Sequence, residues 1–316
     1  MSRQDAKQPQ RWPLLEAGFA PATIAKYKPA VHRFIDWCIR TGQDPSTTDE
    51  LDELLADYFQ QIHDDNNGSG KSIASATLHG IHMYLPRLKA ASALPIASAI
   101  CKRWHKSKPP TSHPPLTWEL TVVIACQMAR AGHYNLGVAT LVGFDCLLRK
   151  EELMSLRREN FADAKDVRLS VNYQKAVLSL DRTKTGRDQS VELRNKSVLH
   201  LLSQVARSTK PRALIFPGGA QKYYRVFKAT CRDLGLSSRY VPHSLRHGGA
   251  TLMLLQGIPI EEIIRHGRWK SSESVKTYIK AGRAQLMAMK APLSVSVAGL
   301  HLAKDIIKSM ALTQKH

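Results

Sequence analysis

The sequence predicts a mostly helical protein with one small β-sheet, an α+β fold that is divided into two domains. Apolar residues recur at three- and four-residue steps through most of the 316-residue chain, which is the period of one helix face. Short runs with the composition of strands occur between residues 167 and 193. A proline-rich stretch at residues 105–116 separates two segments, and each is long enough to bury its own core.

Residues 1–104 are expected to form a small bundle of helices. Thr23 can cap the first helix, because a threonine hydroxyl can accept a hydrogen bond from the free backbone N–H groups of the first turn, and Thr48 opens the second. The apolar residues that follow each threonine share one helix face. Ser72–Leu85 and Pro95–Trp104 are predicted to supply two more helices.

Four prolines within residues 105–115 predict an extended linker, because proline lacks a backbone N–H and restricts the residue before it. The next domain, residues 117–297, is predicted to contain helices at Thr117–Ala131, Leu136–Leu156, Ser197–Ala206, Tyr223–Leu234, Ser244–Gln256 and Ile260–Ile264. Its strands are expected at Val167–Tyr173, Val177–Asp181 and Ser190–Leu193. In the C-terminal segment, 298–316, an amphipathic helix over 300–312 is expected after a loose stretch at 292–299.

The formal net charge of +20 is unevenly distributed along the chain. Residues 1–110 carry 14 Lys and Arg against 11 Asp and Glu, whereas residues 111–316 carry 32 against 15. Because like charges repel one another, an excess of this size favours a polyanionic partner, and nucleic acid is the leading candidate. An anionic membrane surface and simple solubility remain as alternatives.

Several protein classes are disfavoured by composition. No apolar run approaches the ~18 residues that a membrane span needs, and the first twenty residues are polar. The five cysteines are widely spaced and include no Cys-x-x-Cys pair, which argues against a disulfide scaffold or a cysteine zinc site. The sequence therefore predicts an intracellular protein.

Two pairs of residues that could carry chemistry are spaced three positions apart. His243 and Arg246 would share a helix face, where an imidazole can exchange a proton and a guanidinium can bind two phosphate oxygens; a solvated basic face is the alternative. Arg149 interrupts an apolar helix and has Glu152 as its apt partner, either as a structural salt bridge or as an arginine braced to meet phosphate. His243 and His247 have a zinc-like spacing, but no third ligand is evident.

Three further residues are candidates on weaker grounds. Lys184 falls in a predicted hairpin turn, where it is either solvated or a proton donor to a leaving oxygen. Trp269 and Tyr278 are nine residues apart, and core packing is the alternative for both. A tyrosine, with a reference pKa near ~10, becomes a nucleophile only with help from cations or a base. The basic, small-residue stretch after Tyr278 favours access to it.

Together these residues resemble the tyrosine recombinase (phage integrase) family, over essentially the whole chain. The motifs that carry the resemblance occur in the family's order: Arg149-x-x-Glu152-Leu153, Lys184, His243-x-x-Arg246, Trp269 and Tyr278. Gly248-Gly249 and Gly267-Arg268-Trp269 are also similar to recombinases of eukaryotic mobile elements, such as DIRS-like retrotransposons. The resemblance implies a core-binding (SAM-like) DNA-binding domain in residues 1–104 and a catalytic domain in residues 117–297.

The resemblance also implies a role for each residue around the scissile phosphate. Arg149 and Arg246 would clamp its non-bridging oxygens, and Glu152 would brace Arg149 from behind. Lys184 would protonate the departing 5′ oxygen. Because the bond energy is kept in the enzyme–DNA link, the family needs neither metal nor ATP nor another cofactor.

The remaining implied roles concern the nucleophile. Tyr278 would attack and form a 3′-phosphotyrosine bond, and His243 would be its acid–base partner. Trp269 would donate its indole N–H to the phosphate. His266 is the alternative for that position, but the step of nine residues back from Tyr278 favours Trp269.

The implied partners are double-stranded DNA and further copies of the chain, as a dimer on one site and a tetramer in the synapse. The candidate DNA contacts are polar residues of both domains: Lys71, Ser72, Arg87, Lys89, Arg187 and Arg268. The C-terminal segment, 298–316, would dock on a neighbouring protomer or on its own core.

The implied function is a site-specific DNA recombinase or integrase, acting inside the cell on DNA. Alternatives are a sequence-specific DNA-binding protein with a degenerate recombinase site and a type IB topoisomerase-like relaxing enzyme. A metal-dependent transposase is disfavoured because the catalytic half is poor in acidic residues.

Overall fold

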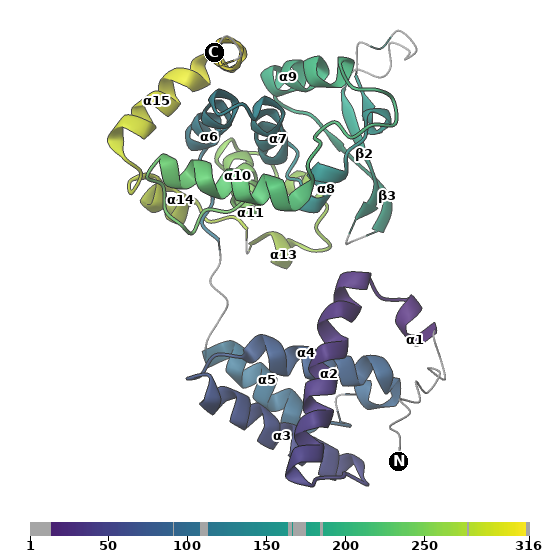
Figure 1. Cartoon of the computed structure of the whole chain (residues 1–316). Coiled ribbons are helices and arrows are strands. Elements are labelled where there is room, and N and C mark those ends of the chain that lie inside the picture. Colours follow the sequence, from purple (N-terminus) through teal and green to yellow (C-terminus); the bar gives the residue numbers. More distant parts are fainter. Residues whose placement is uncertain are drawn as a thin grey trace. The chain divides into compact units, whose positions relative to one another are not determined.

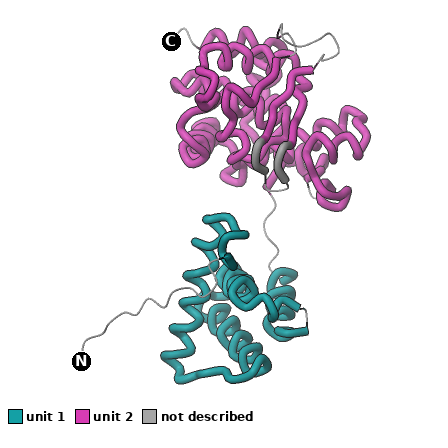
Figure 2. Tube along the Cα trace, turned by 90° about the vertical axis from the view of Figure 1, so that its right-hand side faces the viewer, with its two compact units in different colours: residues 1–111 teal, residues 112–316 magenta. Residues whose placement is uncertain are grey.

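A computed structural model describes residues 14–90, 92–107, 113–163, 166, 175–183, 186–276 and 278–313, with the backbone alone for 181–183 and 186–188. The chain divides into two compact units, residues 1–111 and 112–316 (Figure 2), and the division lies within the predicted linker. The described part is mostly helical with one small sheet, which confirms the predicted fold class.

The first unit is a helical bundle (Figure 1). Its helices are α1 (Leu14–Ala17), α2 (Pro21–Thr41), α3 (Thr48–Asp65), α4 (Lys71–Tyr84), the 3₁₀ helix η1 (Pro86–Lys89) and α5 (Pro95–Ser107). α2 packs on α4 and α3 packs on α5, around a core that includes Phe34, Phe59 and Trp104.

One of the two predicted helix starts of this unit agrees with the structure and one differs. α3 begins at Thr48, as predicted, and is capped by Thr47, whose side chain accepts from the backbone N–H of Glu50, while the Glu50 carboxylate accepts from Thr47 in return. The prediction that Thr23 caps a helix is wrong. Thr23 lies inside α2, which begins at Pro21, where proline's missing N–H costs no helical hydrogen bond.

The second unit is a layered helical domain with a sheet at one side (Figure 1). Its helices are α6 (Trp118–Arg130), α7 (Tyr134–Asp145), α8 (Lys150–Ser155), η2 (Arg158–Asn160), α9 (Lys196–Arg207), α10 (Gly219–Asp233), α11 (His243–Leu255), α12 (Ile260–Gly267), α13 (Ser272–Lys276), α14 (Ala281–Ala288), α15 (Leu293–Lys304) and α16 (Ile306–Leu312). α6 and α7 are almost wholly buried and form its centre.

The sheet of this unit is antiparallel, in the order β1 (Phe161–Ala162), β2 (Val177–Thr183), β3 (Gly186–Glu192). Leu178 of β2 lies opposite Val191 of β3, and both side chains are buried. β2 packs on α8 and β3 packs on α12, so the sheet borders the helices that carry the candidate site. The strand predicted at Val167–Tyr173 lies outside the described residues.

The helix predicted over Leu136–Leu156 is broken in the structure. α7 ends at Asp145, and Leu147 adopts a positive φ of 50°, a backbone conformation that side chains disfavour. The buried Leu147 side chain stabilises this turn, and a new helix, α8, begins at Lys150. Arg149 is therefore the N-cap residue of α8 rather than a residue in the middle of a helix.

Helix α11 lies directly against α7. A Cβ atom placed on Gly249 would come within 2.3 Å of the backbone oxygen of Phe144, so only glycine permits this approach. The contact fixes the N-terminal turn of α11, which begins with His243, beside the break that precedes α8.

The C-terminal helices pack on their own unit. α15 lies along α6, and α16 contacts α6 and α9. Met310 is fully buried, with its Sδ atom 3.8 Å from Sγ of Cys126. The stretch at 292–299 was predicted to be loose, but it is mostly helical: Pro292 is the N-cap residue of α15, and Gly299 packs against the backbone of Glu119. Within the residues that the structure describes, no helix has the length and apolar character to cross a membrane.

Candidate active site

The candidate site is built around Arg246, in the first turns of α11. Its side chain is 0% exposed, and its Nη atoms donate to the backbone oxygens of Leu147 and Gly267. Its guanidinium carbon lies 4.3 Å from the centre of a Trp269 ring and 5.6 Å from that of Tyr278. The arginine is thus fixed by carbonyls on one side and by aromatic faces on the other.

Burial lowers the pKa of Arg246 to about 9, and the positive charges of Arg149 and Arg268 act in the same direction. The opposing charges of Tyr278 and Glu152 raise it only in part. Arg246 is consequently still protonated near neutral pH. A buried cation that carbonyl groups and aromatic rings hold without a carboxylate of its own is suited to an anionic ligand.

Glu152 connects two other arginines of the site. Its carboxylate accepts from Nη1 of Arg149 at 2.5 Å and from Nη2 of Arg268 at 3.0 Å, and it also accepts from the backbone N–H of Arg149. Burial alone would raise the pKa of Glu152, but the hydrogen bond from the Arg149 backbone and the charges of Arg268 and Arg149 lower it overall. The carboxylate is therefore ionised, and Arg149 faces outward with 20% of its side chain exposed.

Aromatic and imidazole rings surround Tyr278, which follows α13. The ring of His247 stacks on that of Tyr278 with centroids 4.4 Å apart, and the ring of His243 meets it edge-on at 5.5 Å. Trp269 lies 4.9 Å away in a tilted arrangement. Nδ1 of His247 also lies 3.3 Å from the backbone oxygen of Tyr278. These contacts hold the half-buried phenol ring beside the first turns of α11, which carry His243, Arg246 and His247.

Both histidines of α11 are neutral near pH 7. Burial lowers the pKa of His243 to about 4, and the charges of Arg246, His113 and Arg149 add to this effect. Burial likewise lowers the pKa of His247 to about 3, with His243 as the next cause. A neutral imidazole keeps one ring nitrogen free to accept a proton.

Among the described residues of the site, three buried N–H donors have no hydrogen-bond partner. They are Nε of Arg246, Nε of Arg268 and Nε1 of Trp269. Buried donors are nearly always hydrogen-bonded in folded proteins, so orphaned donors within one cluster need an explanation. The side chains of Arg246 and Trp269 contact Tyr278, which makes a ligand with acceptor atoms the fitting explanation for those two donors.

A cavity of about 360 Å³ opens beside these residues. Arg149, His243, Lys150, His113 and Tyr224 contribute to its walls. The ring of His113 lies 6.1 Å from that of His243. Two cations and two imidazoles therefore line the approach to the α11 terminus, together with one carboxylate, Glu151, which pairs with Lys150.

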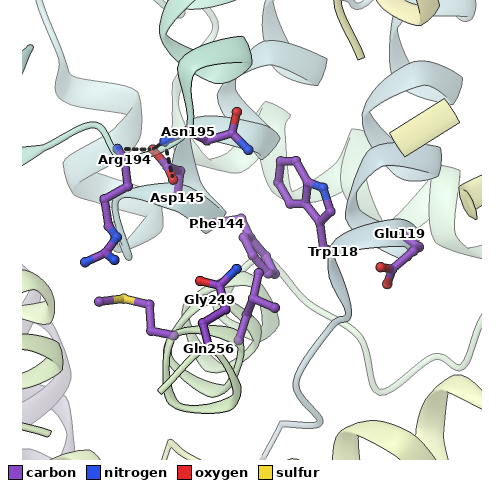
Figure 3. Close-up of a pocket in the computed structure, with 10 residues that line it drawn as sticks. Trp118, Glu119, Phe144, Asp145, Arg194, Asn195, Gly249 and Gln256 are labelled. Carbon is purple, nitrogen blue, oxygen red and sulfur yellow. Dashed lines mark hydrogen bonds between the residues drawn. The ribbon is translucent and has the colours of Figure 1, made fainter. Parts of the chain in front are cut away.

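A separate pocket of about 460 Å³ lies on the other part of α11, and Figure 3 shows it. Trp118, Phe144 and Gln256 are among its walls, and the Asp145 carboxylate accepts the backbone N–H groups of Arg194 and Asn195 there. Burial raises the pKa of Asp145 to about 6. None of the residues predicted for the site from the sequence lines this pocket.

The structure brings together most of the residues predicted from sequence. Arg149, Glu152, His243, Arg246, Trp269 and Tyr278 form one connected cluster. His266 lies apart from the phenol, with its Nε2 atom 2.8 Å from the backbone oxygen of Asp145. Lys184 lies outside the described residues.

The predicted DNA contacts divide into exposed and buried residues. Ser72, Arg87 and Lys89 are exposed, and Lys71 is half-buried at the start of α4. Arg187 pairs through its backbone with Arg182 in the hairpin. Arg268 departs from the expectation of a surface contact, because its side chain is 4% exposed and bound to Glu152.

Two contributors were missed by sequence reasoning. His247 directly follows Arg246, and its position four residues after His243 was weighed only as a zinc spacing, although the same spacing brings both rings to Tyr278. Arg268 was predicted as a DNA contact, and its hydrogen bonds to Glu152 and to backbone oxygens were not foreseen. In the described residues, no group of three His, Cys, Asp or Glu is placed to hold a metal ion.

The fold is that of a tyrosine recombinase. A lambda integrase dimer bound to a COC′ core site superposes with a TM-score of 0.58 at 17% identity, covering 85% of this chain and 74% of that one. The Tn1549 transposon integrase, in complex with transposon right end DNA, gives 0.58 at 12% identity, covering 87% and 96%. A lambda integrase tetramer bound to a Holliday junction gives 0.56 at 17%, covering 85% and 74%.

The chain itself belongs to the phage integrase family, whose model matches residues 124–284. That range runs from α6 to α14 and contains every residue of the cluster described above. No curated protein matches the sequence.

Proposed function

We propose that the protein is a site-specific DNA recombinase or integrase that cuts and rejoins DNA strands through a 3′-phosphotyrosine bond to Tyr278. The observation that carries this proposal is the pair of orphaned buried donors, Nε of Arg246 and Nε1 of Trp269, on side chains that contact the Tyr278 ring. A phosphate oxygen would supply the acceptor that these donors lack.

The proposed step is a transesterification. The Tyr278 oxygen attacks the phosphorus, the new P–O bond to tyrosine forms, and the bond to the 5′ oxygen breaks. The phenol proton passes to His243, which the low pKa of its imidazole keeps neutral and able to accept. The leaving oxygen takes a proton from Lys184. The reverse sequence with another strand's 5′ hydroxyl rejoins the DNA.

Arg149 and Arg246 would stabilise the negative charge that develops on the non-bridging oxygens. Preorganised donors of this kind usually supply the largest single contribution to catalysis, because they need no rearrangement during the reaction. Support comes from the carbonyls that fix Arg246 and from the Glu152 carboxylate that fixes Arg149. His247 would hold the phenol ring through stacking and its contact with the Tyr278 backbone.

The proposed partners are double-stranded DNA and further copies of the chain, as a dimer on one site and a tetramer in the synapse. The net charge of +20 supports a polyanionic ligand. Lambda integrase has been solved as a dimer on a core site and as a tetramer on a Holliday junction, and the Tn1549 integrase on transposon end DNA. Residues 1–104 would act as the core-binding domain, with Lys71, Ser72, Arg87 and Lys89 among its DNA contacts.

Covalent capture tests this proposal. The wild-type chain, Tyr278→Phe and the control Tyr134→Phe are incubated with a pooled library of nicked random duplexes, and DNA that survives denaturant is released by protease and sequenced. Tyr134 is half-buried at the start of α7, away from the cluster. We expect capture by wild type and Tyr134→Phe only, with equal DNA binding by all three.

Other outcomes favour the rival functions. Tight, salt-sensitive binding without any adduct from wild type would indicate a DNA-binding protein with a degenerate site. Relaxation of supercoiled plasmid by a chain that yields no recombinant products would indicate a topoisomerase-like enzyme. Capture by Tyr278→Phe would show that another residue is the nucleophile.

A further inference from the structure

We propose that Arg268 is a positioning residue for the strand-transfer reaction: it anchors Glu152 and the Leu147 carbonyl so that Arg149 and Arg246 keep their places beside the scissile phosphate. This inference rests on the proposed function. Arg268 does not touch the substrate in this role; it acts through the groups that hold the two clamp arginines.

The backbone at Arg268 is unfavourable for an arginine. α12 ends there with φ 57° and ψ 42°, and the N–H groups of Arg268 and Trp269 bond back to Arg265 and Ile264. This arrangement normally places glycine at the left-handed position, because a side chain is strained there. A strained backbone conformation of this kind persists only where contacts with the surrounding structure hold it in place.

The glycine of this turn lies one residue earlier, for a different reason. A Cβ atom on Gly267 would come within 1.8 Å of Cζ3 of Trp269, so that position must be glycine for the indole to lie over the backbone. The turn thus places Trp269 toward Tyr278 and Arg268 toward the interior. The left-handed conformation of Arg268 therefore sets the positions of both side chains.

The side chain of Arg268 reaches the supports of both clamp arginines. Its Nη2 atom lies 3.0 Å from Oε2 of Glu152, whose Oε1 atom holds Arg149. The same Nη2 donates at 3.4 Å to the Leu147 backbone oxygen, which also accepts from Arg246. Further contacts to the oxygens of His266 at 3.2 Å and Cys146 at 3.5 Å fix the guanidinium from the opposite side.

Arg268 also changes the balance of charge around Glu152. If Glu152 paired with Arg149 alone, the two charges would cancel and little attraction for phosphate would remain at Arg149. Arg268 supplies a second cation to the same carboxylate, so that three arginines surround one glutamate at the site. The cluster is left with net positive charge, which is useful only once a phosphate binds beside it.

The test uses the full-length chain and the nicked duplex recovered by covalent capture. Arg268→Met removes both the positive charge and the guanidinium group with its several N–H donors. Arg268→Lys keeps the positive charge but not the guanidinium group. Arg265→Met is the control, because it changes an exposed residue in the same last turn of α12. The single-turnover rate of adduct formation and the Kd for the duplex are measured for each. We expect Arg268→Met to slow adduct formation by about tenfold to a hundredfold with an unchanged Kd, since small misplacements of catalytic groups cost rates of this size.

Arg268→Lys should fall between wild type and Arg268→Met, and Arg265→Met should match wild type. The loss should also shrink when the scissile phosphate is replaced by a methylphosphonate, because less charge then develops on the oxygens. A general loss of packing would slow both substrates alike. In a Glu152→Gln background, Arg268→Met should slow adduct formation little further, because Arg268 acts on Arg149 through the Glu152 carboxylate, which this background lacks.

Melting temperatures separate folding from catalysis. If Arg268→Met does not fold, the comparison of Arg268→Lys with wild type on the two substrates gives the same answer. A wild-type rate for the folded Arg268 variants, or an equal loss on phosphate and methylphosphonate, would overturn the inference while the proposed function stands. Absence of an adduct from wild type would overturn both.

Discussion

The cations of the α4–α5 groove in the first unit and those of the candidate active site in the second unit are held in opposite ways. In the first unit, Lys102 and Lys106 are exposed along α5 and line a groove of about 700 Å³ together with Lys71 of α4. In the second unit, Arg246 is fully buried and fixed by carbonyls, and Arg149 is braced by a carboxylate. Exposed cations attract a polyanion without specifying a geometry, whereas buried and braced cations specify a position for one phosphate group.

The exposed and the buried cations should also differ in how much free energy each contributes to binding or catalysis. Single exposed charges are screened by salt and contribute little individually. A preorganised donor to developing charge contributes ~2.7–4 kcal/mol of transition-state stabilisation. Substitutions in the second unit should therefore change the rate of reaction, and those in the first unit should change affinity and its salt dependence.

The largest effect is expected for Arg149→Ala. Loss of a braced donor should slow adduct formation by about 10²–10³-fold, with only a small loss of DNA affinity. Arg149 is partly exposed, so its removal should disturb folding less than the removal of fully buried Arg246. Single-turnover kinetics on the captured duplex measure the effect, and Lys102→Ala is the matched control with the same loss of charge. A rate within tenfold of wild type would argue against the phosphate clamp.

The next effect concerns the orphaned indole donor. Trp269→Phe retains an aromatic ring beside Arg246 and Tyr278 but removes the N–H, so adduct formation should slow by about tenfold, the value of one hydrogen bond to a charged group. His266→Ala should have a smaller effect on the rate, because its ring bonds the backbone of Asp145 instead. If His266→Ala slows the reaction more than Trp269→Phe, the assignment of the third position is wrong.

The order of the site residues and the pairing of Arg149 with Glu152 could be predicted from the sequence, but the backbone groups that hold Arg246 and Arg268 could not. His243, Arg246, Trp269 and Tyr278 could be recognised because residue type and spacing are visible in the chain. The helix break at Leu147 could not, because neither glycine nor proline marks it and a buried leucine adopts the left-handed conformation.

The inward turn of Arg268 was hidden for the same reason. A basic residue at the end of an amphipathic helix is usually solvated, and only its positive φ turns this one toward Glu152. Fold class and the helix pattern follow from local periodicity, which the sequence displays. The bracing of arginines by distant carbonyls depends on tertiary contacts, which it does not display.

The third effect concerns the pH dependence of protein stability and of the rate of adduct formation. The folded-state pKa of His243, about 4, and that of His247, about 3, lie below the ordinary value of 6.5 because of burial. Between these values the unfolded chain binds more protons than the folded one, so stability is fully present above the unfolded pKa and is lost as the pH falls from about 6.5 toward 4.

Melting temperatures across this range measure that loss for wild type and for His243→Gln, which removes one titrating group. We expect a shallower fall of the melting temperature in His243→Gln. Adduct formation by wild type should fall as the pH decreases toward about 4, the folded-state pKa of His243, because the protonated imidazole can no longer accept the phenol proton. An identical pH dependence of stability in both chains would contradict a buried neutral imidazole at this position.

The smallest effects are expected in the first unit. Lys102→Ala and Lys106→Ala should each weaken DNA binding only a few-fold at moderate salt, and each should reduce the slope of log K against log [salt] by about 1 if the lysine contacts a phosphate. Rates of adduct formation at saturating DNA should stay unchanged, because neither residue belongs to the braced cluster. Binding titrations at several salt concentrations measure the slopes. An unchanged slope would remove the α4–α5 groove from the DNA interface, whereas a reduced rate at saturation would show that exposed charges of the first unit also position the reacting phosphate.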